Sequence, residues 1–180
     1  MNSFRDLFAR ICADGEARHA LRSFNLAPNV DRKARSVKEL AEKLGLTVVL
    51  RSLPRGMAGR LVQDAFSKSG YMIEINDRHS REGQRWAVLH ELGHYFLHVD
   101  RSDPFAFTEH LDRSEFAFYQ TPEKEREANQ FAAVLLFGDG ALAGAVGLYG
   151  QDIDKLAKHF GVSRQAIEIA LKQFLRMSGS

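Results

Sequence analysis

The chain contains almost no cysteine, since Cys12 is the single one in 180 residues. One cysteine cannot form a disulfide within the chain, nor can it supply a zinc site built from several thiolates. We expect Cys12 to be a small buried apolar residue rather than a nucleophile. Any metal bound by this protein must therefore be held by histidine and carboxylate side chains.

Long apolar runs are absent as well. No stretch approaches the roughly 18 apolar residues that a membrane span requires. Charged residues also interrupt the apolar positions near the N-terminus, unlike the apolar centre of a secretory signal. The composition, 44% hydrophobic and 27% charged, is ordinary for a globular domain. These features predict a cytoplasmic protein without membrane contact.

The pattern of apolar residues predicts an α+β protein in three parts. Residues 1–35 are expected to form a helical extension, 36–150 the core, and 151–180 a C-terminal pair of helices. Ser36 and Thr121 are plausible N-caps of core helices. Within the core we expect helices at 36–44, 80–98 and 121–137, strands at 47–53, 59–65 and 69–77, and irregular segments at 99–120 and 138–150.

The segment RWAVLHELGHYFLH, residues 85–98, carries the strongest chemical signal. Residues three and four apart share one face of a helix, so His90, Glu91 and His94 are expected on one side. This is the His-Glu-x-x-His arrangement, in which two imidazoles bind zinc and the glutamate is the general base. Two buried histidines need partners, because an unsatisfied polar group costs about 1–3 kcal/mol. A metal satisfies both, and hydrogen-bonded core histidines are the alternative.

A catalytic zinc of this kind needs a third protein ligand and one open position. One known pattern would place a glycine at position 97 and a histidine at position 100, where this chain has Leu97 and Asp100. The other known arrangement takes a glutamate from a later helix. Glu127 fits best because it extends the buried side of the helix predicted at 121–137, while Glu123 and Glu125 are the alternatives.

The sequence HELGHYFLH followed by EREANQFAAVLLF resembles the ImmA/IrrE family of metallo-endopeptidases. The resemblance extends to VKELAEKLGLTVVL, YMIEIN and LAKHFGVSRQAIEIAL, and it covers roughly residues 36–175. It implies a zincin-like core, in which a small antiparallel sheet packs on two metal-bearing helices. It also implies Zn²⁺ held by His90, His94 and Glu127, with Glu91 as the catalyst. A set of two histidines and one glutamate also accepts iron, cobalt or manganese.

The resemblance also implies a substrate. Family members with known targets are intracellular and cleave DNA-binding repressors of the helix-turn-helix kind, in mobile-element or stress regulation. We therefore expect the protein substrate to be a transcriptional repressor, bound as an added strand along the strand that ends near Asn76. One departure is LLFG at 135–138, where the family often has Leu-Leu-Met-Pro, although the apolar character is retained.

Four further residues are candidates for polarising a scissile carbonyl. They are Tyr95, His98, His110 and Tyr119. For each of them a place in the core or at the surface is the simpler interpretation. His98 is four residues beyond His94 and too far from His90 to share one ion with both, so we expect it to support the site or pack in the core.

Residues 152–175 have the pattern of a helix-turn-helix, with two helices joined by Gly161 and Val162. Ser163, Arg164 and Gln165 would lead the second helix into a major groove. No dense basic face accompanies this pattern, so a packed helical pair or a docking element is favoured over DNA binding. The alternative function is a zinc-containing regulator that binds a partner repressor or DNA without proteolysis. Nothing in the sequence indicates an oligomeric state.

Overall fold

The computed structural model describes residues 15–26, 35–99, 121–138 and 140–178. Cys12, His110, Tyr119 and most of the irregular segment expected at 99–120 lie outside the described residues. Within them the chain has an α+β fold, as predicted. Its seven helices are α2 (Gly15–Leu26), α3 (Val37–Lys43), α4 (Arg81–His98), α5 (Pro122–Phe137), α6 (Ala141–Tyr149), α7 (Ile153–Phe160) and α8 (Arg164–Ser178), and its three strands are β1 (Thr47–Arg51), β2 (Gly59–Gln63) and β3 (Tyr71–Asn76).

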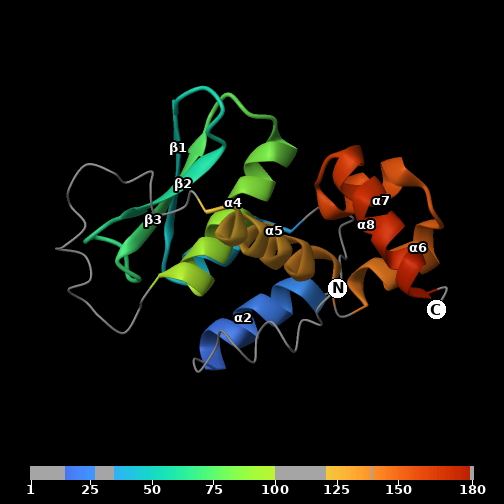
Figure 1. Cartoon of the computed structure of the whole chain (residues 1–180). Coiled ribbons are helices and arrows are strands. Elements are labelled where there is room, and N and C mark those ends of the chain that lie inside the picture. The colour runs from blue at the N-terminus through green and yellow to red at the C-terminus, as the bar shows by residue number, and fades with distance from the viewer. Residues whose placement is uncertain (1–14, 27–34, 100–120, 139, 179–180) are drawn as a thin grey trace.

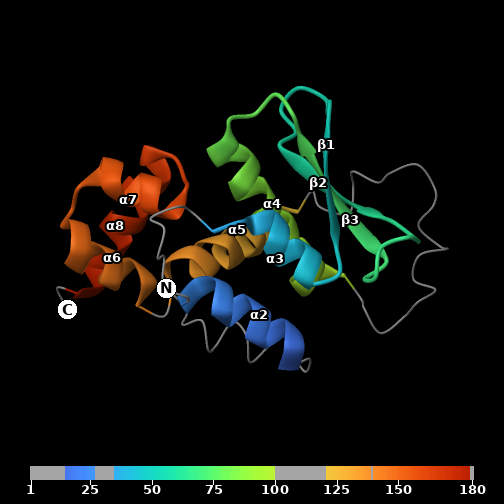
Figure 2. The same ribbon diagram turned by 180° about the vertical axis from the view of Figure 1, so that it is seen from behind.

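Helices α4 and α5 cross at the centre of the molecule, and most other elements pack around this pair (Figure 1). The sheet lies against α4, α2 packs along α5, and α6 to α8 gather beyond the C-terminal end of α5. Helix α3, seen in the view from behind, packs against α4 and strand β1 (Figure 2). Two predicted caps are confirmed, because Ser36 Oγ accepts from the Glu39 N–H at 3.2 Å and Thr121 Oγ1 accepts from the Lys124 N–H at 3.4 Å.

The three strands form a mixed sheet in the order β1-β3-β2. Ile73 of β3 pairs with Leu61 in the antiparallel direction and with Val48 in the parallel direction. The sheet is therefore not wholly antiparallel, because β3 inserts between the two strands that precede it. As the central strand, β3 has both edges paired, so the prediction that substrate adds along the strand ending at Asn76 is wrong. The edge strands are β1 and β2.

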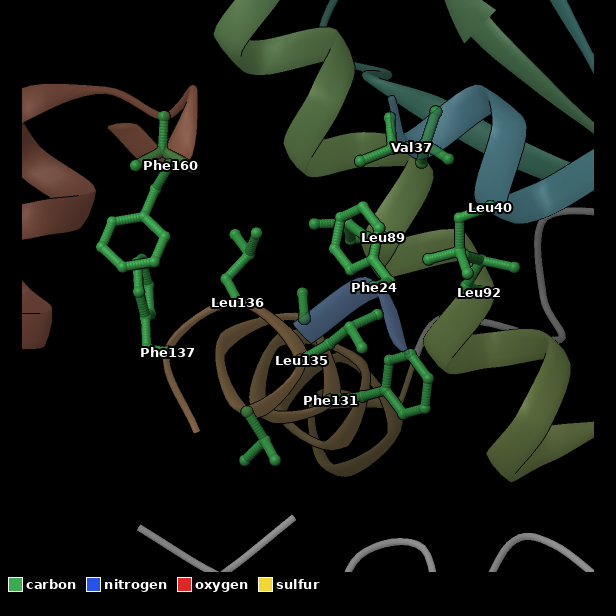
Figure 3. Packing of buried hydrophobic residues seen from close by; sticks show 14 of the residues in the cluster. Phe24, Val37, Leu40, Leu89, Leu92, Phe131, Leu135, Leu136, Phe137 and Phe160 are labelled. Atoms are coloured by element: carbon green, nitrogen blue, oxygen red, sulfur yellow. The ribbon is translucent and has the colours of Figure 1, made fainter. Parts of the chain in front are cut away.

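One hydrophobic core runs through the described residues from α2 to α8. Leu89 and Leu92 of α4 and Phe131 of α5 are fully buried and lie together at its centre (Figure 3). Farther along, the rings of Phe137 and Phe160 meet edge to face with centroids 5.0 Å apart, which joins α5 to α7. Burial of each such side chain contributes about 1.5–3 kcal/mol. This core fixes how α4 lies relative to α5.

A partly buried cation also ties α7 to α4. Arg85 Nε donates to the Phe160 carbonyl at 2.8 Å, and its Nη1 donates to the Arg35 carbonyl. The guanidinium lies over the Phe24 ring, 5.8 Å from the centroid. Burial, followed by the neighbouring charge of Arg35, lowers the pKa of Arg85 to about 10. Arg85 therefore stays charged at neutral pH and holds the end of α7 through its backbone.

Residues 141–149 form helix α6, so the prediction of an irregular segment at 138–150 is wrong there. Leu142 and Ala145 are buried, while Gly144 and Gly147 face open space. Burial of the apolar pair offsets the helix-weakening effect of the glycines, which is about 1 kcal/mol each.

The division of the chain at residues 35 and 150 stays a prediction. None of the helices in the described ranges meets, by itself, the length and hydropathy that a membrane span requires. Helices α5 and α6 meet them only when counted together across the bend of 50° between them.

Candidate metal centre

Helix α4 presents two histidines toward α5. Ser80 Oγ caps the helix by accepting from the Gly83 N–H at 3.2 Å. The His94 side chain is almost completely buried and that of His90 is largely buried. Their ring centroids lie 4.7 Å apart and their Nε2 atoms 3.0 Å apart. The spacing of four residues therefore brings the two imidazoles together as the sequence predicts.

Glu125 of α5 completes a three-residue cluster with these histidines, and the cluster could hold a metal ion. Its Oε2 lies 3.2 Å from His90 Nε2, and its Oε1 lies 3.3 Å from His94 Nε2. Ligand atoms held on one tetrahedral zinc ion by bonds of about 2.0–2.1 Å would lie about 3.3 Å from one another. The two histidine nitrogens lie 3.0 Å apart and each faces a different oxygen of Glu125, so the three side chains are close enough to share a single ion.

The cluster depends on a close approach of α4 and α5 at Gly93. A Cβ added there would lie 2.9 Å from Ala128 Cα and 3.0 Å from the Ala128 carbonyl oxygen. Glycine opposite alanine thus allows the two helix backbones to meet. Glu125 lies three residues before Ala128, and Asn129 follows it directly. The contact therefore carries both side chains to the histidines of α4.

Both histidines are neutral at neutral pH. Burial lowers the pKa of His90 although the Glu125 charge acts in the opposite direction. Burial, followed by the charges of His90 and His98, lowers the pKa of His94 to about 3. His90 Nδ1 lies 3.2 Å from Asn129 Oδ1, which can only accept, so the proton sits on Nδ1 and Nε2 keeps its lone pair. The Nε2 lone pairs of both histidines and the Glu125 carboxylate then face one another. A single cation could accept electron pairs from all three groups.

Glu91 lies beside this cluster, against strand β2. Its side chain is buried, and a Cβ added at Gly59 would lie 3.4 Å from Glu91 Cγ. Burial, followed by the charge of Glu125, raises the pKa of Glu91 to about 8, while a backbone hydrogen bond from Leu61 acts in the opposite direction. A carboxyl group with a pKa in this range can take up and release a proton near neutral pH, as a general base must.

Glu127 is turned toward a different histidine from the two in the cluster. Its Oε2 lies 3.0 Å from His98 Nε2, and His98 Nδ1 in turn lies 2.9 Å from His94 Nδ1. His98 thus stands behind His94, on the side of the ring away from Glu125. The structure brings Glu125 to the paired histidines, and a ligand role for Glu127 stays a prediction.

Tyr95 packs in the hydrophobic core, where its ring meets Tyr71 with centroids 5.6 Å apart. Sequence reasoning left Glu125 as an alternative ligand and overlooked Asn129. A signal for both was present, because Glu125 and Asn129 flank Ala128 on one side of the helix. A small residue such as Ala128 marks the place where a second helix can approach closely.

A helix with the His-Glu-x-x-His pattern, a carboxylate from a second helix and an adjoining small sheet form the arrangement used by metal-dependent peptidases. The chain belongs to the family Peptidase_M78, the IrrE N-terminal-like domain, which matches residues 41–172. This confirms the resemblance to the ImmA/IrrE family and supports a peptidase function.

The chain was also compared with curated protein sequences and with solved structures. No curated protein matches the chain in sequence. A solved structure, a Mycobacterium tuberculosis transcriptional regulator, is 20% identical, with a TM-score of 0.51, over 91% of this chain and 49% of that chain. At this identity the likeness shows the fold alone. The chain spans about half the length of that regulator.

Proposed function

We propose that this chain is a zinc-dependent endopeptidase of the cytoplasm that cleaves a transcriptional repressor. The observation that carries the proposal is the convergence of His90, His94 and Glu125 beside the buried acid Glu91. Membership of a peptidase family supports the same reaction class. Iron, cobalt or manganese would also suit this set of donors, and zinc is the expectation for a His-Glu-x-x-His site.

The proposed metal ligands are His90, His94 and Glu125. Glu125 approaches both imidazoles to within 3.3 Å, whereas Glu127 lies 3.0 Å from His98. Two neutral imidazoles and one carboxylate leave a fourth position open, as in catalytic rather than structural zinc sites. Zinc held by these residues would supply a water whose pKa is lowered to about 7 and would polarise the scissile carbonyl.

Glu91 is the proposed general base. It accepts a proton from the attacking water and delivers that proton to the leaving nitrogen as the peptide C–N bond breaks. The raised pKa of Glu91 belongs to the protein without a metal. A cation held beside this carboxyl would favour its charged form, which the first step requires. The position of Glu91 against β2 suggests that an extended substrate lies along this edge strand, which brings the scissile bond to Glu91.

A transcriptional repressor is the proposed substrate. The resemblance to ImmA/IrrE peptidases is the main support for it. The structurally similar protein from Mycobacterium tuberculosis is described as a transcriptional regulator, so this fold also occurs in a protein of transcription control. Helices α7 and α8, which have the helix-turn-helix pattern, are a suitable element for docking such a repressor.

Direct DNA binding through α7 and α8 is the second candidate function. Ser163, Arg164 and Gln165 are exposed at the start of α8, as a helix that reads bases requires. However, Arg164 forms an ion pair with Asp154, and the acidic Glu168 is exposed one turn farther on. Because this mixture of charges does not favour phosphate binding, we favour proteolysis.

The variant Glu91→Gln separates a peptidase from a binding protein. Zinc-loaded wild type and Glu91→Gln would each be incubated with a panel of purified helix-turn-helix repressors from the same genome, and new N-termini identified by mass spectrometry. We expect wild type to produce one or a few defined new termini. Glu91→Gln should produce them about 10²- to 10⁴-fold more slowly with unchanged zinc content. Termini that appear equally fast with both proteins, or with neither, would overturn the proposal.

A further inference from the structure

A second histidine and a carboxylate stand behind His94, and the proposed reaction leaves them without a role. His94 Nδ1 lies 2.9 Å from His98 Nδ1, and His98 Nε2 lies 3.0 Å from Glu127 Oε2. The side chains of His94, His98 and Glu127 are 1%, 4% and 51% exposed. The three groups therefore form a connected series from the buried cluster to the protein surface.

The hydrogen-bond roles along this series follow once His94 Nε2 faces the metal site. A neutral imidazole has one N–H group and one lone pair, so His94 must donate from Nδ1. His98 then accepts at its own Nδ1 and carries its proton on Nε2. From Nε2 it donates to the Glu127 carboxylate. Each nitrogen thus has one role, and the series ends on a negative charge.

We infer that Glu127 and His98 are positioning residues that hold His94 in the orientation and tautomer needed for metal binding. The inference rests on the proposed function. A metal-bound histidine commonly donates its other N–H to a carboxylate or carbonyl group, which fixes the ring and strengthens the ligand nitrogen. Here His98 transmits the effect, because donation to Glu127 makes its Nδ1 a better acceptor for His94.

The other histidine of the cluster is held by a different device. His90 Nδ1 lies 3.2 Å from Asn129 Oδ1, and Trp86 Nε1 donates to the same oxygen at 3.2 Å. His90 is therefore oriented by a neutral amide that it shares with an indole, whereas His94 is oriented through His98 by a carboxylate. Helix α5 thus supplies two glutamates with different roles. Glu125 faces the proposed metal site, and Glu127 contacts the His98 ring.

Zinc affinity, measured by competition with a chromophoric chelator, tests this inference. Glu127→Ala should still bind one zinc per chain at saturation, with a Kd about 10- to 100-fold weaker than wild type. Glu127→Gln keeps an acceptor and should lose less affinity. The control Glu123→Ala removes a carboxylate that is 69% exposed on the same helix. It should leave the Kd unchanged, which separates positioning from a general loss of negative charge.

The tautomer of His98 gives a second readout, from ¹⁵N spectra of the imidazole side chains in zinc-loaded protein. Wild type should show His98 protonated on Nε2, and Glu127→Ala should shift it toward a mixture of tautomers. A proton on His98 Nδ1 in wild type would overturn the inference. Equal Kd values for Glu127→Ala and Glu123→Ala would also overturn it.

The variant Glu125→Ala separates failure of this inference from failure of the proposed function. If Glu125→Ala loses zinc while Glu127→Ala behaves like Glu123→Ala, the inference fails and the proposed metal site stands. If Glu127→Ala loses zinc at saturation while Glu125→Ala retains it, Glu127 is itself the ligand, and both the inference and the proposed ligand set fail. Wild type that binds no zinc would overturn both.

Discussion

The α4–α5 crossing and the α7–α8 pair are both built from two packed helices, but they bury different kinds of side chain. At the crossing, the ionisable side chains of Glu91 and His94 are buried. In the α7–α8 pair the buried side chains are apolar, among them Leu156 and Ile167, and charged side chains such as Arg164 lie at the surface. Both pairs can be compared in Figure 1.

This difference indicates where the chemistry resides. Burying an ionisable group costs free energy unless a partner or a metal offsets the cost. Because this cost arises at the α4–α5 crossing and not in the buried part of the α7–α8 pair, we place the proposed reactive site at the crossing. In the described part of the α7–α8 pair the buried side chains are apolar, which suits a structural or docking role.

The largest change in folding stability is expected from the titration of Glu91 at the α4–α5 crossing, in metal-free protein. Folding raises the pKa of Glu91 from 4.5 to about 8, so the folded chain binds more protons than the unfolded chain between these pH values. This contribution to stability is full below about pH 4.5 and is lost as the pH rises through about 8, by up to about 1.4 kcal/mol per pH unit. The lowered pKa values of His90 and His94 act in the opposite direction up to about pH 6.5. Urea denaturation should therefore show the net loss of stability between about pH 6.5 and 8.

Replacing Glu91 by Gln should flatten that pH dependence, because the titrating group is removed. The exposed acid Glu123, changed to Gln, serves as the control and should leave the slope as in wild type. Parallel slopes for wild type and Glu91→Gln would mean that the buried carboxyl does not titrate in this range.

The next largest change in stability is expected at Arg85, where α4 meets α7. Arg85→Met removes two donors to the carbonyls of Phe160 and Arg35, and it should lower the free energy of unfolding by about 2–3 kcal/mol. Arg81→Met, at an exposed position of the same helix, should change it by less than about 0.5 kcal/mol. Comparable losses in the two variants, measured by urea denaturation, would contradict a special role for Arg85.

A matched pair of glycines tests how tightly the crossing is packed. Gly93→Ala forces a methyl group against the Ala128 backbone and should destabilise the protein by about 1–3 kcal/mol. Gly147→Ala in α6 meets open space and should stabilise it by about 0.5–1 kcal/mol, because alanine favours a helix. Thermal unfolding would show the midpoints moving in opposite directions. Movement in the same direction would mean that α4 and α5 do not meet at Gly93.

The smallest effect is expected on the surface of the C-terminal pair. Arg164→Ala breaks the ion pair with Asp154, but both side chains are largely exposed, and such pairs contribute about 0–1 kcal/mol. Urea denaturation should place this variant within about 1 kcal/mol of wild type. A clearly larger loss would show that α7 and α8 depend on charge as well as on apolar packing.

The site could be predicted from the sequence where it depends on one helix and not where it depends on two. The spacing of His90, Glu91 and His94 within α4 was enough to place them on one face. The choice between Glu125 and Glu127 depends on how α5 crosses α4, which is set by the contact of Gly93 with Ala128. Apolar periodicity gives the buried side of a helix but not the point at which it meets a neighbour.

The same limit applies to the fold. The α+β class, the order of the elements and the capping residues Ser36 and Thr121 followed from local pattern. The parallel pairing of β1 with β3 did not, because strand order depends on contacts across the sheet. Helix α6 was missed because its glycines lower helix propensity, whereas burial of Leu142 and Ala145 stabilises it in the folded chain.

The most direct test of the central claim is the metal content of wild type, Glu125→Ala and Glu123→Ala, purified without chelator or metal-affinity resin and measured by mass spectrometry. We expect about one zinc per chain in wild type and in Glu123→Ala, as one tetrahedral site requires, and clear loss in Glu125→Ala. Absence of bound metal in wild type, even after zinc is added back, would contradict the claim. His90 and His94 would then be hydrogen-bonded core residues, and both the proposed metal site and the proposed peptidase function would be wrong.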